Sequence, residues 1–357
     1  MVKMASTAGE LKSRADLSVY FKDSGGGKNP IARKRNSRKN QKKLWISTYN
    51  IQTMRLDEHL EELEHELQLI KWSVLGICET RLMGEVGTVL KSGHMLYQNN
   101  SINNTHNGGV AIMVHKNLKH LVTKTRATSE RVIYIVMKLN QRYTIQVIQV
   151  YAPTTTAEDK EIEHLYEDVS TARRAEKAKF TVVMEDFNAK MGPRTTEDLQ
   201  IIGPYGLGVR NSRDQMLLDY LGSENLFCMN TFFKKSPQRK WTWKSPNNLT
   251  KNEIDYILTN TKEICTDVSV LNKFYIGSDH YLVRATILIN IKRERHKLMK
   301  TKTFRPILKE LELKQLEYQE TLQTKLQPQD LAGMNINKLS ERITRSIQIA
   351  TKKLVHK

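Results

Sequence analysis

The stretch KFTVVMEDFNAK, residues 179–190, joins an apolar run to a polar cluster. The run from Phe180 to Met184 has the length and β-branched content of a buried strand, and it stops abruptly at EDFN. Two explanations compete: the polar residues form a turn that ends the strand, or they belong to an active site. Catalytic groups are often carried on loops held by a rigid sheet, so the surrounding sequence has to decide.

Outward from this stretch, short apolar runs alternate with helical and loop-like segments. The runs with the length and composition of strands are 44–49, 73–78, 109–114, 132–139, 143–150, 180–184, 254–259 and 281–289. Helices are predicted over 56–72, 157–178 and 214–226, the last with Gly222 as a stop signal. Strands mixed with helices over about 250 residues predict a single α/β domain.

Two segments of different composition flank this domain. Residues 1–43 are glycine-rich, polar and basic, with almost nothing to bury, so we expect a disordered basic tail. Its cluster ARKRNSRKNQKK, residues 32–43, is a nuclear localisation signal, a phosphate-binding arm or a plain solvated tail. We expect a nuclear location, with the cytoplasm as the alternative. Residues 292–357 are charged and predict a helical extension, with amphipathic helices over 307–326 and 337–354.

The charge balance is the unusual feature of the composition. With 357 residues, of which 39% are hydrophobic, the chain can bury a sizeable core. Its 57 lysines and arginines outnumber 38 acidic residues, giving a net charge of +19 and a pI of about 9.7. This balance favours a polyanionic partner, either nucleic acid or an anionic membrane, over a merely solvated surface.

The cysteines and the hydropathy pattern exclude several classes. Cys78, Cys228 and Cys265 lie in or beside apolar runs without CxxC spacing, which argues against a disulfide framework or a zinc site. The first thirty residues hold no apolar secretory core, and no apolar run approaches the roughly 18 residues of a membrane span. We therefore expect buried free thiols and no membrane partner. No obligate protein partner is inferred.

Polar side chains stand at the ends of several expected strands. They are Asn50, Glu79, Tyr151, Asp186, Asn188, Asp255, Asp279 and His280. Singly, each is explained as a turn residue, a solvated carboxylate or a core tyrosine. Together, strand-terminal carboxylates can converge at one edge of a sheet. Such a set supplies oxygen ligands for Mg²⁺, a group that orients water and a cation for a phosphate, as phosphodiester hydrolysis requires.

The order of the motifs resembles a known family. The strings are TYNIQ (48–52), ICETRL (77–82), GGVAIMV (108–114), VYAPT (150–154), MEDFNAKMG (184–192), TWKSPNN with NEIDYIL (242–258) and GSDHYLV (277–283). Over roughly residues 44–290 they resemble the endonuclease/exonuclease/phosphatase family, which includes DNase I and the apurinic endonucleases. Within it, they are most similar to the endonuclease domains of RTE/BovB-type non-LTR retrotransposons.

The resemblance implies a fold and a reaction. The fold would be a DNase I-like four-layer α/β sandwich, with two mixed β-sheets flanked by helices, over residues 44–291. The tail 1–43 and the extension 292–357 would lie outside it. The substrate would be a DNA backbone, hydrolysed with Mg²⁺ or Mn²⁺ to leave a 3′-hydroxyl.

The resemblance also implies a role for each polar residue. For the metal, Glu79 would be the principal ligand, with Asn50 beside it and Asp279 supporting the metal or its water shell. For catalysis, Asp186 would position and deprotonate the attacking water, and Asn188 would hold that water or a phosphate oxygen. Tyr151 would donate a hydrogen bond to the phosphate. His280, oriented by Asp255, would stabilise the charge that develops on the phosphate.

Three positions depart from the family pattern. Glu185 stands where relatives generally have glycine, and a side chain there can forbid the required backbone angles or raise the pKa of Asp186 by repulsion. The alternative is that Glu185 points away. Gln52 replaces an aspartate of the apurinic endonucleases, and Glu253 stands where many relatives are neutral or basic. We predict a complete catalytic set with activity weakened by Glu185.

One segment indicates how DNA would be held. The stretch KKSPQRKWTWKSPNN, residues 234–248, interleaves basic and aromatic residues, which suits a loop that follows phosphates and stacks a base. The candidate contacts are Lys234, Lys235, Arg239, Lys240, Trp243 and Lys244. At least one of Trp241 and Trp243 is expected in the core instead.

Three alternatives to a working DNA endonuclease stay open. The first is a domesticated DNA-binding or chromatin-associated protein with weakened or lost catalysis. The second is another substrate of the same fold, such as an inositol phosphate or sphingomyelin, which the charge of +19 disfavours. The third is a truncated element product, since a YxDD reverse-transcriptase signature is not found; the C-terminal helices would then be a remnant linker or a dimerisation hairpin.

Overall fold

The computed structural model describes residues 41–100, 108–154, 157–196, 198, 200–301, 315–327 and 333–355. All of them belong to one of the two units into which the chain divides, Asn40–Lys357. The expected disordered tail lies outside the described residues except for its last three. Those three open strand β1 (Gln41–Asn50), which therefore begins earlier than expected.

The eight expected strands are all present. Besides β1 they are β2 (Val74–Cys78), β5 (Val110–Val114), β7 (Val132–Lys138), β8 (Thr144–Tyr151), β9 (Phe180–Asp186), β13 (Asp255–Thr259) and β15 (Leu282–Asn290). The expected helices are α2 (Asp57–Gln68), α3 (Asp159–Ala175) and α4 (Ser212–Ser223). Helix α4 starts before the predicted residue 214, because Asn211 and Asp214 form a capping box at its N-terminus.

Several strands were not predicted. They are β3 (Val86–Val89), β4 (Met95–Asn99), β6 (Val122–Ser129), β14 (Cys265–Leu271) and the two-residue strands β10 (Phe227–Cys228), β11 (Trp243–Lys244) and β12 (Lys251–Asn252). Strands β3 and β6 lie at the edges of their sheets and are largely exposed, so they lack the apolar run of a buried strand. Short 3₁₀ turns occur at Lys119–Leu121, Met229–Phe232, Pro237–Arg239 and Lys262–Ile264.

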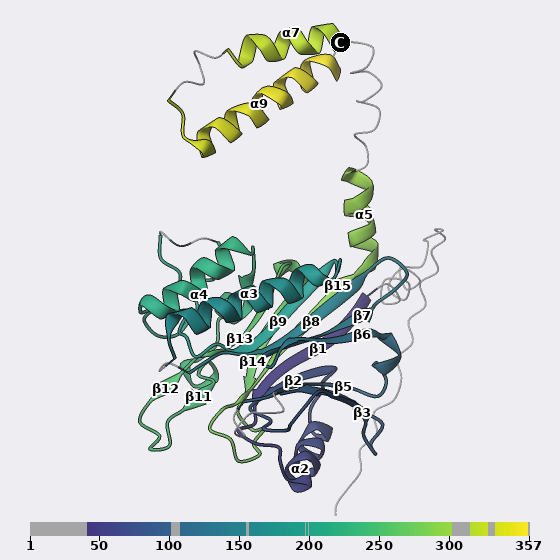
Figure 1. The fold of residues 1–357 in the computed structure, drawn as a ribbon, viewed down its shortest axis with the longest axis vertical. Coiled ribbons are helices and arrows are strands. Elements are labelled where there is room, and N and C mark those ends of the chain that lie inside the picture. Colours follow the sequence, from purple (N-terminus) through teal and green to yellow (C-terminus); the bar gives the residue numbers. More distant parts are fainter. Residues whose placement is uncertain are drawn as a thin grey trace, which may run out of the picture. The chain divides into compact units, whose positions relative to one another are not determined.

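Two mixed sheets face each other and helices cover their outer sides (Figure 1). One sheet has the order β14-β15-β1-β2-β5-β4-β3 and the other β10-β13-β9-β8-β7-β6. One apolar cluster fills the space between the sheets, a second joins the β9 sheet to α3 and α4, and a third joins the β1 sheet to α2. This is the four-layer sandwich that the family resemblance implied.

The strand register gathers the polar strand ends at one rim. In the first sheet, β1 runs parallel to β2, so Asn50 pairs with Cys78, the residue before Glu79. In the second sheet, Tyr151 of β8, Asp186 of β9 and Asp255 of β13 lie in one register row. Both parallel pairs end toward the same site, so side chains distant in sequence meet there.

The C-terminal segment is helical where it is described. It contains α5 (Ile291–Thr301), α7 (Gln315–Lys325) and α9 (Ile336–Val355), and α7 packs on α9. Helix α9 agrees with the prediction over 337–354, whereas residues 307–314 of the other predicted helix lie outside the described residues. Across the described residues, no helix combines the length and apolar character that crossing a membrane requires.

Candidate active site

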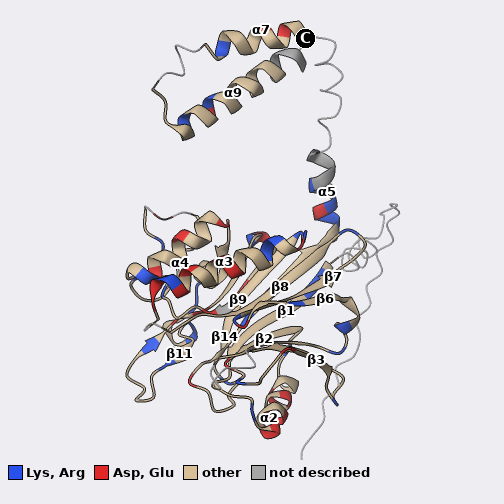
Figure 2. Cartoon of the chain, viewed as in Figure 1, with Lys and Arg blue, Asp and Glu red and all other residues tan. Residues whose placement is uncertain are grey.

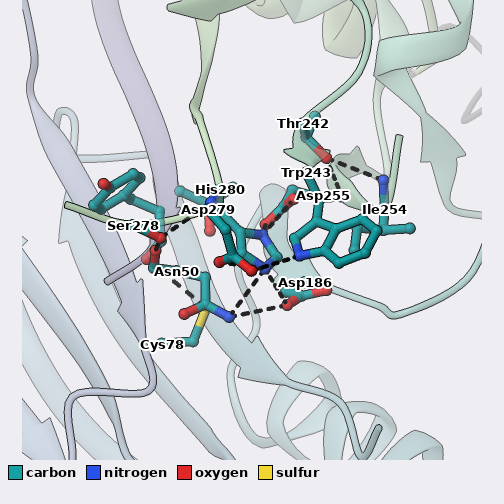
Figure 3. A network of polar contacts seen from close by, with 12 residues as sticks. Asn50, Cys78, Asp186, Thr242, Trp243, Ile254, Asp255, Ser278, Asp279 and His280 are labelled. Carbon is teal, nitrogen blue, oxygen red and sulfur yellow. Dashed lines mark hydrogen bonds and ion pairs between the residues drawn. The ribbon is translucent and has the colours of Figure 1, made fainter. Parts of the chain in front are cut away.

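His280 and three carboxylates form the centre of the site (Figure 3). The His280 Nδ1 atom lies 3.0 Å from Asp255 Oδ2, and its Nε2 atom lies 3.6 Å from Asp186 Oδ2 and 3.9 Å from Asp279 Oδ1. His280 is 5% exposed, Asp186 2% and Asp255 0%. The imidazole is thus held between two buried acids, with one ring nitrogen directed to each.

Burial and mutual attraction set the protonation of this group. Burial raises the pKa of the Asp186 carboxyl to about 7, although the His280 charge opposes that rise. Burial alone would lower the pKa of His280, but the charges of Asp255 and Asp186 outweigh it and raise the pKa to about 10. At neutral pH the imidazole is therefore a cation, while Asp186 can accept or release a proton.

Three polar side chains hold the His280–Asp255 pair in place. Thr242 Oγ1 accepts hydrogen bonds from the backbone N–H groups of Ile254 and Asp255, at 3.0 and 3.1 Å. The Asn230 amide donates to the Asp255 carbonyl at 2.9 Å. Ser278 Oγ accepts from the His280 N–H at 3.0 Å. The sequence analysis assigned a role to none of the three, although Thr242 lies in the TWKSPNN string and Ser278 in the GSDH string. Asn230 lies outside every recognised motif.

Asn50 connects the two sheets through its side chain. Its amide donates to Glu79 Oε1 at 2.7 Å and to Asp186 Oδ2 at 3.1 Å, and its own Oδ1 accepts from the Gln52 N–H at 3.0 Å. In this arrangement Asn50 is a donor to carboxylates. The metal-ligand role expected for it stays a prediction.

The backbone around the site is strained. Gln52, Glu79, Arg81 and Asn188 have φ angles of 64°, 55°, 56° and 49°. Non-glycine residues adopt this left-handed conformation at a cost that surrounding contacts have to offset, and it is common at functional sites. The conformation turns Glu79 and Asn188 off the ends of their strands and into the wall of the pocket.

Asp279 is fixed by two donors. Gln52 Nε2 donates to its Oδ1 at 2.7 Å, and Trp243 Nε1 donates to its Oδ2 at 2.8 Å. Gln52, which stands in place of a family aspartate, thus supports a carboxylate that a second acid would repel. Trp243 lines the pocket from the β11 side, consistent with contact to a substrate as well as partial burial.

A pocket of about 430 Å³ opens over these groups. Glu79, Asp186, Asn188, Trp243, Asp279 and His280 are among its lining residues. A neighbouring pocket of about 650 Å³ shares Glu79 and Thr154 with it and is lined by Tyr151, Arg81 and Arg131. Arg131 stacks 5.4 Å from the Tyr151 ring centroid, and burial together with Glu79 raises the pKa of the Tyr151 hydroxyl, which keeps it a hydrogen-bond donor.

The donor set fits a divalent cation. Glu79 and Asp279, with side chains 21% and 23% exposed, present carboxylate oxygens to the pocket, and hard cations such as Mg²⁺ and Mn²⁺ prefer oxygen ligands. Asp186, Asp255 and His280 form a second group, whose ligand atoms all lie within 4.8 Å of one another. A metal ion there would need the neutral imidazole, so it would compete with the cationic form of His280.

The prediction that Lys240 contacts DNA is wrong. It is 5% exposed, its Nζ lies 3.0 Å from Glu253 Oε1, and it donates to the Asn230 carbonyl at 2.7 Å. A buried ammonium already paired with a carboxylate cannot reach a phosphate. The same pair explains the unusual acid at Glu253, which is 2% exposed and balances the lysine.

The other predicted DNA contacts in residues 234–248 differ in how exposed they are and whether they are already paired with an acid. Lys234 and Arg239 are exposed, and Lys244 is half-buried. Lys235 Nζ lies 2.6 Å from Asp267 Oδ1, so its charge is already partly balanced. Their contact with DNA stays a prediction.

Glu185 has the backbone of an ordinary strand residue. It lies in β9, paired with Val150 on one side and Tyr256 on the other. Extended backbone is open to any residue, so the fold does not require glycine at this position. The Glu185 side chain lies outside the part of the chain whose side chains the structure describes, and its effect on Asp186 stays a prediction.

Comparisons with known proteins agree with this geometry. The model of the endonuclease/exonuclease/phosphatase family matches residues 47–280. Craniofacial development protein 2 from Bos taurus is 29% identical over 250 residues, which cover 69% of this chain and 41% of that protein; the Tragulus javanicus protein of the same name is also 29% identical, with 69% and 42% covered. The chain thus spans about two fifths of the length of these curated relatives.

A solved structure shares the fold. An AP endonuclease from Leishmania major superposes with a TM-score of 0.52 at 11% sequence identity, covering 69% of this chain and 87% of that one. At this identity the likeness concerns the fold alone.

Proposed function

The chain belongs to the endonuclease/exonuclease/phosphatase family, and from this premise we propose that it is a divalent-metal-dependent DNA endonuclease that nicks a DNA backbone. One observation carries the proposal: His280 is buried as a cation between Asp255 and Asp186, beside a pocket that Glu79 and Asp279 also line. A fixed cation next to a proton-accepting carboxylate suits hydrolysis of a phosphodiester. We assign the activity to residues 44–291.

The chain's own residues divide the work of the reaction. Asp186 would take the proton of the attacking water, while the Asn188 amide would hold that water or a phosphate oxygen. His280 would face the phosphoryl oxygens and stabilise the charge that develops on them, and Asp255 would keep the ring oriented. Tyr151 would donate its hydroxyl to the phosphate.

Glu79 and Asp279 would hold the metal, Mg²⁺ or Mn²⁺. When bound there, the ion would supply positive charge for the phosphate and for the departing oxygen. Asn50, Gln52 and Trp243 fix these carboxylates through hydrogen bonds, so the ligands are oriented before any ion arrives.

DNA is the substrate that the sequence and the relatives favour. The net charge of +19 suits a polyanion, and the structural neighbour is named an AP endonuclease. A retrotransposon-type origin and a nuclear location belong to the same proposal, the first from the motif order and the second from the basic cluster at residues 32–43.

The direct test is nicking of supercoiled plasmid by the purified chain. We expect relaxed circles with Mg²⁺ or Mn²⁺ and none with EDTA. Inositol phosphate and sphingomyelin, assayed beside the plasmid, should stay intact. Plasmid binding without nicking in any divalent metal would contradict the enzyme and favour a domesticated DNA-binding protein.

The pH profile tests the assignment of the base. Because the pKa of Asp186 is raised to about 7, the carboxyl is protonated below that pH and cannot accept a proton from water. Initial nicking rates from pH 5 to 9, at constant metal and ionic strength, should fall about tenfold per pH unit below about 7 and level off above it. Plasmid binding in EDTA over the same range is the control. A flat rate between pH 5 and 7 would exclude Asp186 as the base.

A further inference from the structure

The excess positive charge of this chain lies outside its catalytic domain. Residues 44–291 contain 29 lysines and arginines against 28 aspartates and glutamates, so the domain is almost neutral. The two flanking segments together contain 28 basic and 10 acidic residues. A domain that is almost neutral overall gains little from the long-range attraction that contributes strongly to nucleic-acid binding, so that attraction has to come mainly from the flanks.

Helix α9 presents part of this charge as an ordered stripe. Lys338, Arg342 and Arg345 are spaced by four and three residues, which places them on one face of the helix. Ala350, which is 0% exposed, lies on a different face, and Ser346, 5% exposed, lies between the two faces. Helix α9 packs on α7. Figure 2 shows Lys and Arg on both helices.

A groove runs along this basic face. It has a volume of about 480 Å³ and is lined by Lys325 of α7 and by Lys338, Arg342 and Arg345 of α9, with Glu341 as an acid among them. Met334, Ser346 and Ile349 complete the lining. Four cations against one anion leave the groove strongly positive.

We propose that this groove, between α7 and the basic face of α9, is a second nucleic-acid-binding site that holds the phosphate backbone of the DNA on which the catalytic domain acts. The spacing of the basic residues matches the spacing of phosphates in a duplex. Lys338 to Arg345 spans about 10 Å of helix, and one strand of a duplex presents about three phosphates over that length. The proposal rests on the proposed function only for the choice of DNA as the polyanion.

A basic amphipathic helix also suits an anionic membrane, so the two partners have to be weighed. Membrane-surface helices insert their apolar face, which needs that face to be free. In α9 the apolar Ile343 and Ile347 are 38% and 42% exposed, so the apolar face is only partly covered, but neither residue lines the groove, whose lining is mainly charged. A charged groove contacts phosphates without inserting an apolar face, so the lining favours a phosphate backbone over a lipid surface.

The test measures binding of a fluorescent 20-base-pair duplex to the full chain in EDTA, where cleavage does not interfere. The variant Lys338→Gln/Arg342→Gln/Arg345→Gln should weaken binding on the order of 10-fold at about 0.1 M salt. It should also lower the slope of log Kd against log salt by about 2 to 3, since each lost phosphate contact removes about 0.9. The charge-preserving Lys338→Arg/Arg342→Lys/Arg345→Lys should bind as the parent does.

A matched control removes the same charge elsewhere. Lys91, Lys119 and Lys138 are exposed and lie toward the opposite ends of the strands from Glu79 and Asp186, so their triple change to Gln should alter Kd less than about twofold. Equal losses in the two triple variants would overturn the proposal. So would loss of sedimentation with phosphatidylserine vesicles while duplex binding stays intact, which would assign the groove to a membrane. Failure of plasmid nicking, by contrast, would bear only on the catalytic domain.

Discussion

His280→Ala is expected to lower the rate of metal-dependent plasmid nicking about 10³-fold or more. The variant loses the cation that stabilises the charge developing on the phosphate, and removing one such donor typically costs 10²- to 10³-fold. It also leaves the buried carboxylates of Asp186 and Asp255 without their counter-charge. The pKa of Asp186 should then rise further, so the water loses its base as well.

The matched control is His164→Ala. His164 lies on α3 with its side chain 67% exposed, so its removal takes away an imidazole without touching the site. We expect nicking within twofold of the parent for this control and no change in the thermal midpoint. Duplex binding in EDTA should survive in His280→Ala, which separates a catalytic defect from unfolding. Retention of more than a tenth of the parent rate would refute the role given to His280.

Lys240→Met is expected to destabilise the protein by about 3 to 5 kcal/mol, the usual cost of removing one partner of a buried ion pair. The lysine balances Glu253, and burial already raises the pKa of that carboxyl. Without the ammonium, Glu253 must either stay charged in the interior or take up a proton. The loss should be visible as a lower urea midpoint of unfolding with an unchanged m-value.

A second variant separates charge from packing. In Lys240→Met/Glu253→Gln both charges are gone, so most of the lost free energy of unfolding should return. Lys234→Met, in the same segment but exposed, should cost less than about 0.5 kcal/mol. If Lys240→Met instead leaves stability unchanged and weakens duplex binding, the lysine is a phosphate contact after all.

The pair also matters for the active site. Lys240 donates to the carbonyl of Asn230, whose amide binds the carbonyl of Asp255, and Glu253 is two residues before Asp255. The buried pair therefore lies directly behind the carboxylate that orients His280. Its loss is expected to loosen the site before the whole domain unfolds.

The sequence by itself determined the strands of the sandwich and the identity of the central polar residues. Buried strands such as 132–139 and 180–184 are continuous apolar runs, and that signal is local, so it survives without any knowledge of the fold. The order of the motifs along the chain identified the family that it resembles. Edge strands such as β6 were not predicted from the sequence, because a strand that is exposed on much of its surface needs no apolar run.

Only the tertiary structure decided which polar groups serve the site and which serve the fold. Thr242 and Asn230 bind the backbone of β13, and Lys240 turns inward to Glu253, although the local sequence of each resembles that of a surface loop. The reason is physical: these roles depend on which strands pair and in what register across two sheets. A hydrogen bond between residues 25 apart, or a charge neutralised by a partner 13 residues away, leaves no periodicity along the chain.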